Sequence, residues 1–483
     1  MHVHRFSSVP AWLRASFLSG DGGNGVAPGR RGGGLFTLVV LAAGAALRLW
    51  AIHAHPQIQG DSLLYGDIAV NWLTHGIYGH SVGHASGATT VEPTLVRLPG
   101  YPAFLALCFA LFGLASYRAV LYLQAIIDLV TCLLIAALAG KICGQRAARV
   151  ALLLAALCPF MANYVASPLT ETLSIFCVAL GFRALAGMLE GPRLTWTVLL
   201  IFSWSYAALL RPDGALLAVV LWVALIVYGR NSLGFAYALR LALVAGLLSV
   251  LPFAAWTLRN WHTFHVFQPL APRYATDPGE FGAPGFVRWV RTLSVDFTST
   301  SEIYWNGNSD RIDPGDLPAR AFDNAGQYQQ TRRLLDDYNA ITTLTPELDA
   351  RFDLLAQERI RAHPFRYYVA LPLLRLADMW LRPRVETLNT NLRWWEYAQH
   401  PGETWVAIFY GALNLAYLVA ALLGMLRWPR LAGAMLALIV LRSLLLATIE
   451  APEPRYTLEC FPLLIAFAAV AIAGCDGQEP RRI

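Results

Sequence analysis

Long apolar runs alternate with short polar segments along this chain, and this pattern predicts a bundle of membrane-spanning helices. A helix of about 20 apolar residues crosses the roughly 30 Å hydrocarbon core of a bilayer. Ten runs approach this length. They cover residues 35–54, 118–140, 148–166, 169–189, 194–210, 214–228, 241–258, 404–426, 431–449 and 458–474. The expected fold is therefore an all-α polytopic membrane protein with about ten transmembrane helices.

Two further apolar segments fit better as interfacial helices. Residues 101–115 would reach only about 22 Å at about 1.5 Å per residue, which is short of the hydrocarbon core. Residues 363–383 carry Arg366, Arg375 and Asp378, and a charge at mid-bilayer costs about 2.5–3.5 kcal/mol. We expect both segments at the membrane surface, and their composition leaves a crossing as the alternative.

Basic residues between the runs give the expected orientation. Arg30 and Arg31 precede the first run, and cytoplasmic segments of membrane proteins are enriched in Lys and Arg. Ten crossings then return Lys141, Arg230 and both ends of the chain to the cytoplasmic side. We predict a cell-envelope protein of the bacterial inner membrane.

This orientation divides the chain into five parts. They are a disordered cytoplasmic tail over 1–34, a transmembrane region over 35–258 that contains a first extracytoplasmic loop at 55–117, an extracytoplasmic region over 259–403, transmembrane helices over 404–474 and a cytoplasmic tail over 475–483.

Composition agrees with the membrane assignment. Of the 483 residues 56% are hydrophobic and 14% are charged, whereas a soluble domain carries about 25% charged residues. The net charge of +6 is better explained by membrane topology than by a nucleic-acid partner. The chain has no basic patch interleaved with aromatic residues, which is typical of nucleic-acid binding. The region 259–403 contains no cysteine, so it has no disulfide framework.

The polar groups expected outside the membrane gather at the ends of the runs. The five clusters are 61–97, Glu171, 211–213, 259–260 and 450–456. The first begins with Asp61 and Tyr65, four residues apart, which a helix would present on one face. It ends with Arg97 and the sequence Pro-Gly-Tyr-Pro at 99–102.

This first loop resembles that of the GT-C glycosyltransferases that use polyprenyl-phosphate sugars, such as the protein O-mannosyltransferases and lipid A aminoarabinose transferases (glycosyltransferase family 39). In that family the loop acid faces the acceptor, and a basic residue just before the Pro-Gly-Tyr contacts the donor phosphate. Asp61 and Arg97 occupy these places. The family usually has Asp-Glu where this chain has Asp61-Ser62, which leaves Asp67 as a stand-in for the second acid.

Later segments extend the resemblance. The family often carries an acid after the third span, Arg-Asn at the exit of the seventh and Arg-Tyr before the last, as at Glu171, Arg259 and Arg455. The resemblance implies Asp61 as the catalytic residue. It also implies a set of substrate-binding residues, which are Tyr65, Asp67, Arg97, Tyr101, Glu171, Arg259, Arg455 and Tyr456.

The chemistry of sugar transfer needs these residue types. A carboxylate such as Asp61 can accept the proton of an attacking hydroxyl, which contributes about 10²–10⁴-fold to the rate. An Arg fork donates two hydrogen bonds to the oxygens of a leaving phosphate. The resemblance implies inversion at the sugar, with a polyprenyl-phosphate sugar as donor, a glycan, lipid or protein as acceptor, and membrane lipids as neighbours.

Simpler roles remain open for these residues. Asp61 could cap the loop helix, Glu171 could cap a transmembrane span, and Arg455 could pair with Glu450 or Glu453. Arg97 and Arg259 could bind lipid headgroups.

Metal binding is also left open. His75, His80 and His84, with Glu92, could suggest a metal site, but their irregular spacing favours a solvated glycine-rich loop. No cofactor is therefore assigned, and a divalent metal stays possible.

A transporter or flippase of lipid-linked sugars is the rival function. Transporters place ionisable residues near mid-membrane, where this chain has one acid, Asp128. We expect Asp128 to pair within the bundle and Arg48 to extend its head group to the membrane surface.

Overall fold

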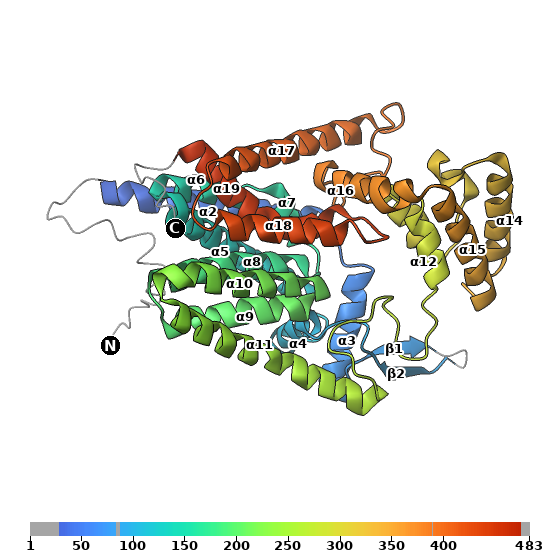
Figure 1. Ribbon diagram of the computed structural model, residues 1–483, viewed down its shortest axis with the longest axis horizontal. Coiled ribbons are helices and arrows are strands. Elements are labelled where there is room, and N and C mark those ends of the chain that lie inside the picture. The colour runs from blue at the N-terminus through green and yellow to red at the C-terminus, as the bar shows by residue number, and fades with distance from the viewer. Residues whose placement is uncertain (1–28, 84–86, 389, 475–483) are drawn as a thin grey trace.

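The computed structural model describes residues 29–83, 87–388 and 390–474, and these are mostly helical (Figure 1). Most of the tail expected over 1–34 and all of that expected over 475–483 lie outside the described residues.

Within the described chain, seven helices are long and apolar enough to cross a membrane. They are α2 (Gly29–Ala54), α5 (Tyr117–Cys143), α8 (Glu171–Glu190), α10 (Ala215–Ser232), α11 (Phe235–Phe264), α17 (Pro401–Leu426) and α19 (Phe461–Ala473), the last with the 3₁₀ turn η6 (Pro454–Cys460) before it. Three shorter apolar helices join them: α4 (Gly100–Phe112), α9 (Leu194–Leu210) and α18 (Ala432–Leu446). The expected all-α polytopic membrane fold is confirmed.

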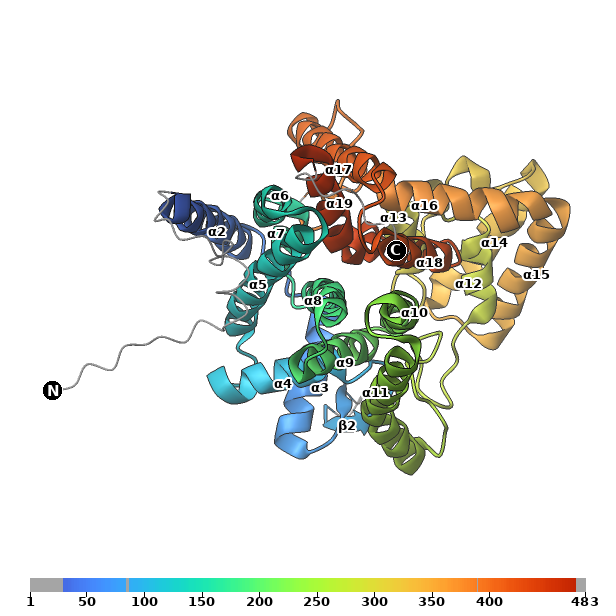
Figure 2. The same cartoon turned by 60° about the vertical axis from the view of Figure 1, so that its left-hand side comes forward.

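Helix α8 occupies the middle of the bundle when the helices are viewed nearly end-on (Figure 2). It packs against α5, α9 and α10, and nearly all of its side chains are buried. Gly181 permits this packing, because a Cβ there would lie 2.6 Å from Leu221 Cδ1. The N-terminus of α8 therefore holds Glu171 at a fixed place in the interior.

The single helix predicted over 148–166 is wrong. The chain instead forms α6 (Gln145–Ala156) and α7 (Pro159–Tyr164). Cys158 adopts an extended backbone, with φ −70° and ψ 108°, and Pro159 starts the second helix. Proline has no amide hydrogen and restricts the residue before it to extended conformations, so the helix ends there.

Arg48 also differs from expectation. Its side chain does not extend to the membrane surface but is fully buried in the bundle. Its Nε donates a hydrogen bond of 2.7 Å to Asp128 Oδ2, which confirms the expected pairing of Asp128 within the bundle. An unpaired charge at this depth would be far more costly, so the pair is a structural feature.

The first loop contains a helix, a hairpin and a second helix. Helix α3 (Asp61–His75) leads into antiparallel strands β1 (Gly79–Gly83) and β2 (Thr89–Pro93), and α4 follows. The hairpin was not expected from this glycine-rich stretch. Gly79 is required, because a Cβ there would lie 2.2 Å from the carbonyl oxygen of Glu92.

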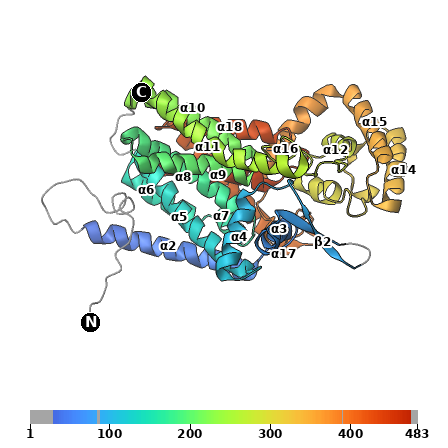
Figure 3. The same cartoon turned by 90° about the horizontal axis from the view of Figure 1, so that it is seen from below.

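The region after α11 forms a small helical unit at the same end of the molecule as the hairpin (Figures 1 and 3). Its helices are α12 (Pro284–Arg291), α13 (Phe297–Ser299), α14 (Ala325–Ile341), α15 (Pro346–Ala362) and α16 (Leu371–Leu381). Trp289, Leu335 and Phe352 belong to its own apolar core. Its two longest helices, α14 and α15, have 17 residues each.

Candidate active site

A cavity of about 170 Å³ lies where the first loop meets the ends of the transmembrane helices. Segments far apart in the sequence contribute its walls. The lining residues are Asp61, Tyr65, Val96, Arg97, Leu98, Leu169, Thr170, Glu171, Leu210, Arg211, Pro212, Ala271, Arg455 and Tyr456. We call this space the site cavity.

Asp61 is the first residue of α3, and its carboxylate pairs with arginine. Asp61 Oδ1 accepts a hydrogen bond of 2.6 Å from Arg97 Nη2, and Oδ2 lies 3.9 Å from Arg455 Nη2. Burial alone would raise the pKa of Asp61, but the charges of Arg97 and Arg455 outweigh it and hold that pKa below its usual value. The carboxylate is therefore negative at neutral pH.

Arg97 is held between aromatic and backbone groups. Its guanidinium carbon lies 5.7 Å from the centre of the Tyr65 ring, a cation–π distance. Tyr78 Oη donates a hydrogen bond of 2.9 Å to the Arg97 carbonyl. Burial would lower the pKa of Arg97, yet the charge of Asp61 raises it overall, so the guanidinium stays charged.

Glu171 begins α8 with its side chain almost fully buried. Its Oε1 lies 3.2 Å from Arg211 Nη1 and 3.6 Å from Arg455 Nη1. The positive end of a helix dipole also favours a carboxylate at this position. Glu171 therefore sets the spacing between two arginines in the cavity wall.

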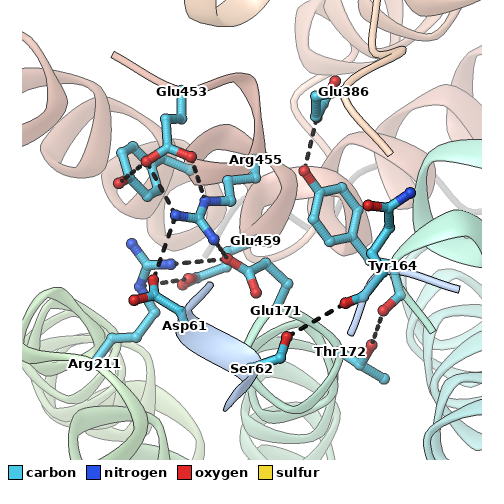
Figure 4. Close-up of polar contacts among 12 residues, drawn as sticks. Asp61, Ser62, Tyr164, Glu171, Thr172, Arg211, Glu386, Glu453, Arg455 and Glu459 are labelled. Carbon is cyan, nitrogen blue, oxygen red and sulfur yellow. Dashed lines mark hydrogen bonds and ion pairs between the residues drawn. The ribbon is translucent and has the colours of Figure 1, made fainter. Parts of the chain in front are cut away.

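Arg455 comes from η6, the turn before α19, and reaches three acids (Figure 4). Beyond Asp61 and Glu171, its Nε lies 2.6 Å from Glu453 Oε2, which is one of the pairings expected from the sequence. Buried Arg384 fixes the turn, because Nη1 donates to the Pro454 carbonyl at 2.7 Å.

Three of the residues predicted to bind substrate do not line the site cavity. Tyr101 packs against Tyr65 with ring centroids 5.1 Å apart, and its hydroxyl donates to Gln124 Oε1 at 2.7 Å. It supports the cavity wall from behind.

Asp67 and Arg259 hold the loop instead. Asp67 accepts hydrogen bonds from the amide and hydroxyl of Ser81, at 2.6 and 2.7 Å, and so ties the hairpin to α3. Arg259 donates to the carbonyls of Thr94 and Tyr78, at 2.8 and 2.6 Å. Both residues order the segment that leads to Arg97.

Arg211 lines the cavity but was not among the predicted site residues. Burial would lower the pKa of Arg211, but the charges of Asp213, Glu459 and Glu171 outweigh it and raise that pKa well above the usual value. The sequence signal was its place in a polar cluster at the end of an apolar run. Glu459 and Arg442, which stand behind it, lie inside predicted spans and gave no such signal.

The cavity wall contains three arginines and two carboxylates. Arg97, Arg211 and Arg455 face Asp61 and Glu171, which gives a net charge of about +1. Five charges from separate segments could not stay together in a buried wall without this pairing. Glu453 pairs with Arg455, and Asp213 and Glu459 pair with Arg211, from outside this wall.

The histidine, cysteine and acidic side chains in the ranges that the structure describes are not arranged as a metal site. No group of three or more His, Cys, Asp or Glu side chains there is arranged to hold an ion. His80 lies opposite Glu92 across the hairpin, and His84 is outside the described residues.

Residues 93–256 match the family model of dolichyl-phosphate-mannose-protein mannosyltransferase. The matched segment is roughly a third of the chain and includes Arg97, Glu171 and Arg211. Among curated proteins there is no significant match.

Two kinds of solved structure are similar to the chain at low sequence identity. The oligosaccharyltransferase AglB of Archaeoglobus fulgidus, in complex with an inhibitory peptide and a dolichol-phosphate, is 12% identical, and the match covers 90% of this chain and 50% of that one, with a TM-score of 0.46. ArnT of Cupriavidus metallidurans, bound to undecaprenyl phosphate, is 14% identical, with 91% and 77% covered and a TM-score of 0.35. The chain thus spans about half the length of the archaeal protein.

Proposed function

We propose that this chain, a glycosyltransferase of the GT-C superfamily, transfers a sugar from a polyprenyl-phosphate donor to a hydroxyl or phosphate of the acceptor. The transfer inverts the configuration at the anomeric carbon. The observation that carries the proposal is the site cavity, where three arginines and the Asp61 carboxylate converge.

The arginines suit the donor phosphate. In the diester donor the phosphate carries one negative charge, and it leaves as a monoester with more. Arg97, Arg211 and Arg455 come from three different segments, so their guanidinium groups can approach a phosphate from several sides. Such preorganised donors stabilise the charge as it develops, which is the largest single contribution in many enzymes.

Asp61 suits the acceptor. The acceptor oxygen attacks the anomeric carbon from the face opposite the phosphate, and its proton passes to the Asp61 carboxylate. The bond from carbon to the phosphate oxygen breaks, and its electron pair leaves with the phosphate. One displacement with one base and no covalent intermediate inverts the configuration.

Donor binding would also prepare the base. In the structure Asp61 shares its charge with Arg97 and Arg455, which weakens it as a proton acceptor. A donor phosphate would draw these guanidinium groups away and add its own negative charge nearby. Both effects raise the pKa of Asp61 toward the value that general base catalysis needs.

The surroundings of the cavity fit a lipid-linked donor. Basic residues favour the opposite end of the bundle as cytoplasmic, so the site cavity would face the extracytoplasmic side, in a bacterium the outer face of the inner membrane. The polyprenyl chain would lie along the bilayer. The unit formed by α12, α14 and α15, at the same end, would help to select a glycan, lipid or protein acceptor.

The test is to incubate the purified protein with a panel of polyprenyl-phosphate sugars and acceptors and to measure released polyprenyl phosphate. Release that depends on an acceptor supports the proposal, and Asp61→Asn is the matched inactive control. Transbilayer movement of intact donor without release would favour a flippase instead. The Arg48–Asp128 pair speaks against that rival, because Asp128 is already engaged in the bundle.

A further inference from the structure

Arg442 is a buried charge that the proposed reaction does not use directly. It lies in α18, an apolar helix, and is 3% exposed. An arginine within a membrane helix is costly unless it is paired, and it therefore marks a functional position by default. Its side chain is not part of the cavity wall.

Two carboxylates join Arg442 to Arg211. Arg442 Nη2 lies 3.0 Å from Asp213 Oδ2, and Nη1 lies 2.9 Å from Glu459 Oε2. The other oxygens of the same carboxylates lie 3.2 and 3.5 Å from Arg211 Nε. Each of the two carboxylates thus lies between the two guanidinium groups. A movement of Arg211 would therefore disturb the ion pairs of Arg442.

A third contact joins Arg442 to the turn that carries Arg455. Arg442 Nε donates a hydrogen bond of 2.8 Å to the Tyr456 carbonyl. Tyr456 follows Arg455 directly, and both line the site cavity. One buried guanidinium therefore touches the supports of two of the three cavity arginines.

We propose that Arg442 is a positioning residue that fixes Arg211 and the Arg455 turn against the donor phosphate. The inference rests on the proposed function. The planar guanidinium of Arg442 pairs with two carboxylates while its Nε–H donates to a carbonyl, and a lysine ammonium cannot reproduce this geometry. A displacement of about 1 Å in a binding group can cost on the order of 10²-fold in rate.

The experiment compares donor kinetics and undecaprenyl phosphate binding for the purified wild type and Arg442→Lys. We expect donor KM to rise about 10-fold or more and undecaprenyl phosphate to bind correspondingly more weakly. A purely structural role would lower the folded fraction and leave KM unchanged. Arg48→Lys is the matched control, because Arg48 is equally buried and paired but lies away from the site cavity; we expect it to reduce stability alone.

Double variants test the connection. Arg442→Lys and Arg211→Lys should be non-additive because they share Asp213 and Glu459. Arg442→Lys and Arg48→Lys should be additive, since no contact joins that pair in the described structure and Arg48 lies away from the site cavity. Additivity with Arg211 would overturn the inference.

A second variant guards against misfolding. Arg442→Met combined with Glu459→Met removes one charge of each sign, and apolar replacement of a buried pair is often tolerated. We expect it to fold and still to raise donor KM. If both this variant and Arg442→Lys bind undecaprenyl phosphate as the wild type does, the inference fails. If the wild type itself does not bind, the proposed function fails instead.

Discussion

The carboxylate of Asp61 lies 2.6 Å from the guanidinium of Arg97, and this ion pair closes the first loop across 36 residues. It joins the proposed base to a proposed ligand of the donor phosphate. In the structure the two groups therefore satisfy each other, and in the proposed reaction the donor would separate them before transfer.

Asp61→Asn tests the base. Asparagine keeps the size of the side chain and can still accept a hydrogen bond from Arg97, but it cannot take a proton. We expect a folded protein that retains donor binding and loses at least about 10²-fold in turnover. Turnover is measured as released polyprenyl phosphate. Near-normal turnover would leave Asp61 as a structural partner of Arg97.

The pH profiles of kcat/KM and kcat should differ, because the first reports the pKa of Asp61 in the free enzyme and the second its pKa in the donor complex. Arg97 and Arg455 lower the pKa of Asp61 in the free enzyme, so Asp61 should cause no loss of kcat/KM for the donor until the pH falls below the range in which an ordinary aspartate titrates. In the proposed mechanism, donor binding would weaken these ion pairs and raise the pKa of Asp61. We therefore expect the acid limb of the kcat profile at higher pH than that of kcat/KM. Coincident limbs would argue against displacement of the arginines.

Asp67→Asn distinguishes loop support from a second catalytic acid. Asp67 binds Ser81 in the hairpin, so its loss should lower stability by about 1 kcal/mol and turnover by less than about 10-fold. Thermal unfolding and turnover are measured on one preparation. A turnover loss as large as that of Asp61→Asn would return Asp67 to the role implied by the family resemblance.

The sequence predicted the transmembrane fold and several residues of the cavity wall for one physical reason. Charges are costly in a bilayer, so Asp61, Arg97, Glu171 and Arg455 stand out at the ends of apolar runs. All four line one cavity in the structure.

The same reasoning could not identify the supports behind the cavity. Glu459 and Arg442 lie inside apolar runs, and their pairing depends on the packing of α18 against η6, which local sequence does not encode. Asp67 and Arg259 were assigned to substrate by the family resemblance, whereas their partners are Ser81 in the hairpin and the carbonyls of Tyr78 and Thr94 beside it. The sequence did not predict that hairpin, because it lies in a stretch rich in glycine, a residue that usually disfavours strands.

Single cysteines test the orientation of the membrane fold. Ser309 lies in the region after α11, and Asn231 lies near the end of α10; both are exposed. We expect an impermeant thiol reagent to label Ser309→Cys in intact cells and to reach Asn231→Cys only after the membrane is opened. The parent protein supplies the background labelling. The reverse pattern would place the site cavity on the cytoplasmic side.

The proposed binding of the donor phosphate by arginine side chains, called the clamp below, can be tested on Arg97 and Arg455. These two residues approach Asp61 from two segments at 2.6 and 3.9 Å. Lysine at either position keeps the charge but loses the fork that binds two phosphate oxygens. We expect each single substitution to lower turnover by at least about 10-fold, which is less than the roughly 10²–10³-fold lost when one transition-state hydrogen-bond donor is removed outright, because lysine keeps the charge. The two changes should be non-additive, because both groups act on one phosphate.

The competing account is the ion pair between Arg455 and Glu453, whose atoms lie 2.6 Å apart. If that pair were the whole role of Arg455, lysine would replace it well, and Glu453→Gln would be as harmful as any change at Arg455. The clamp requires the opposite order, because Glu453 does not line the site cavity and acts on it through its contacts with Arg455 and Tyr456. Donor KM and turnover for Arg97→Lys, Arg455→Lys, their double variant and Glu453→Gln decide between the two. A fully active Arg455→Lys would remove Arg455 from the clamp and leave the phosphate to Arg97 and Arg211.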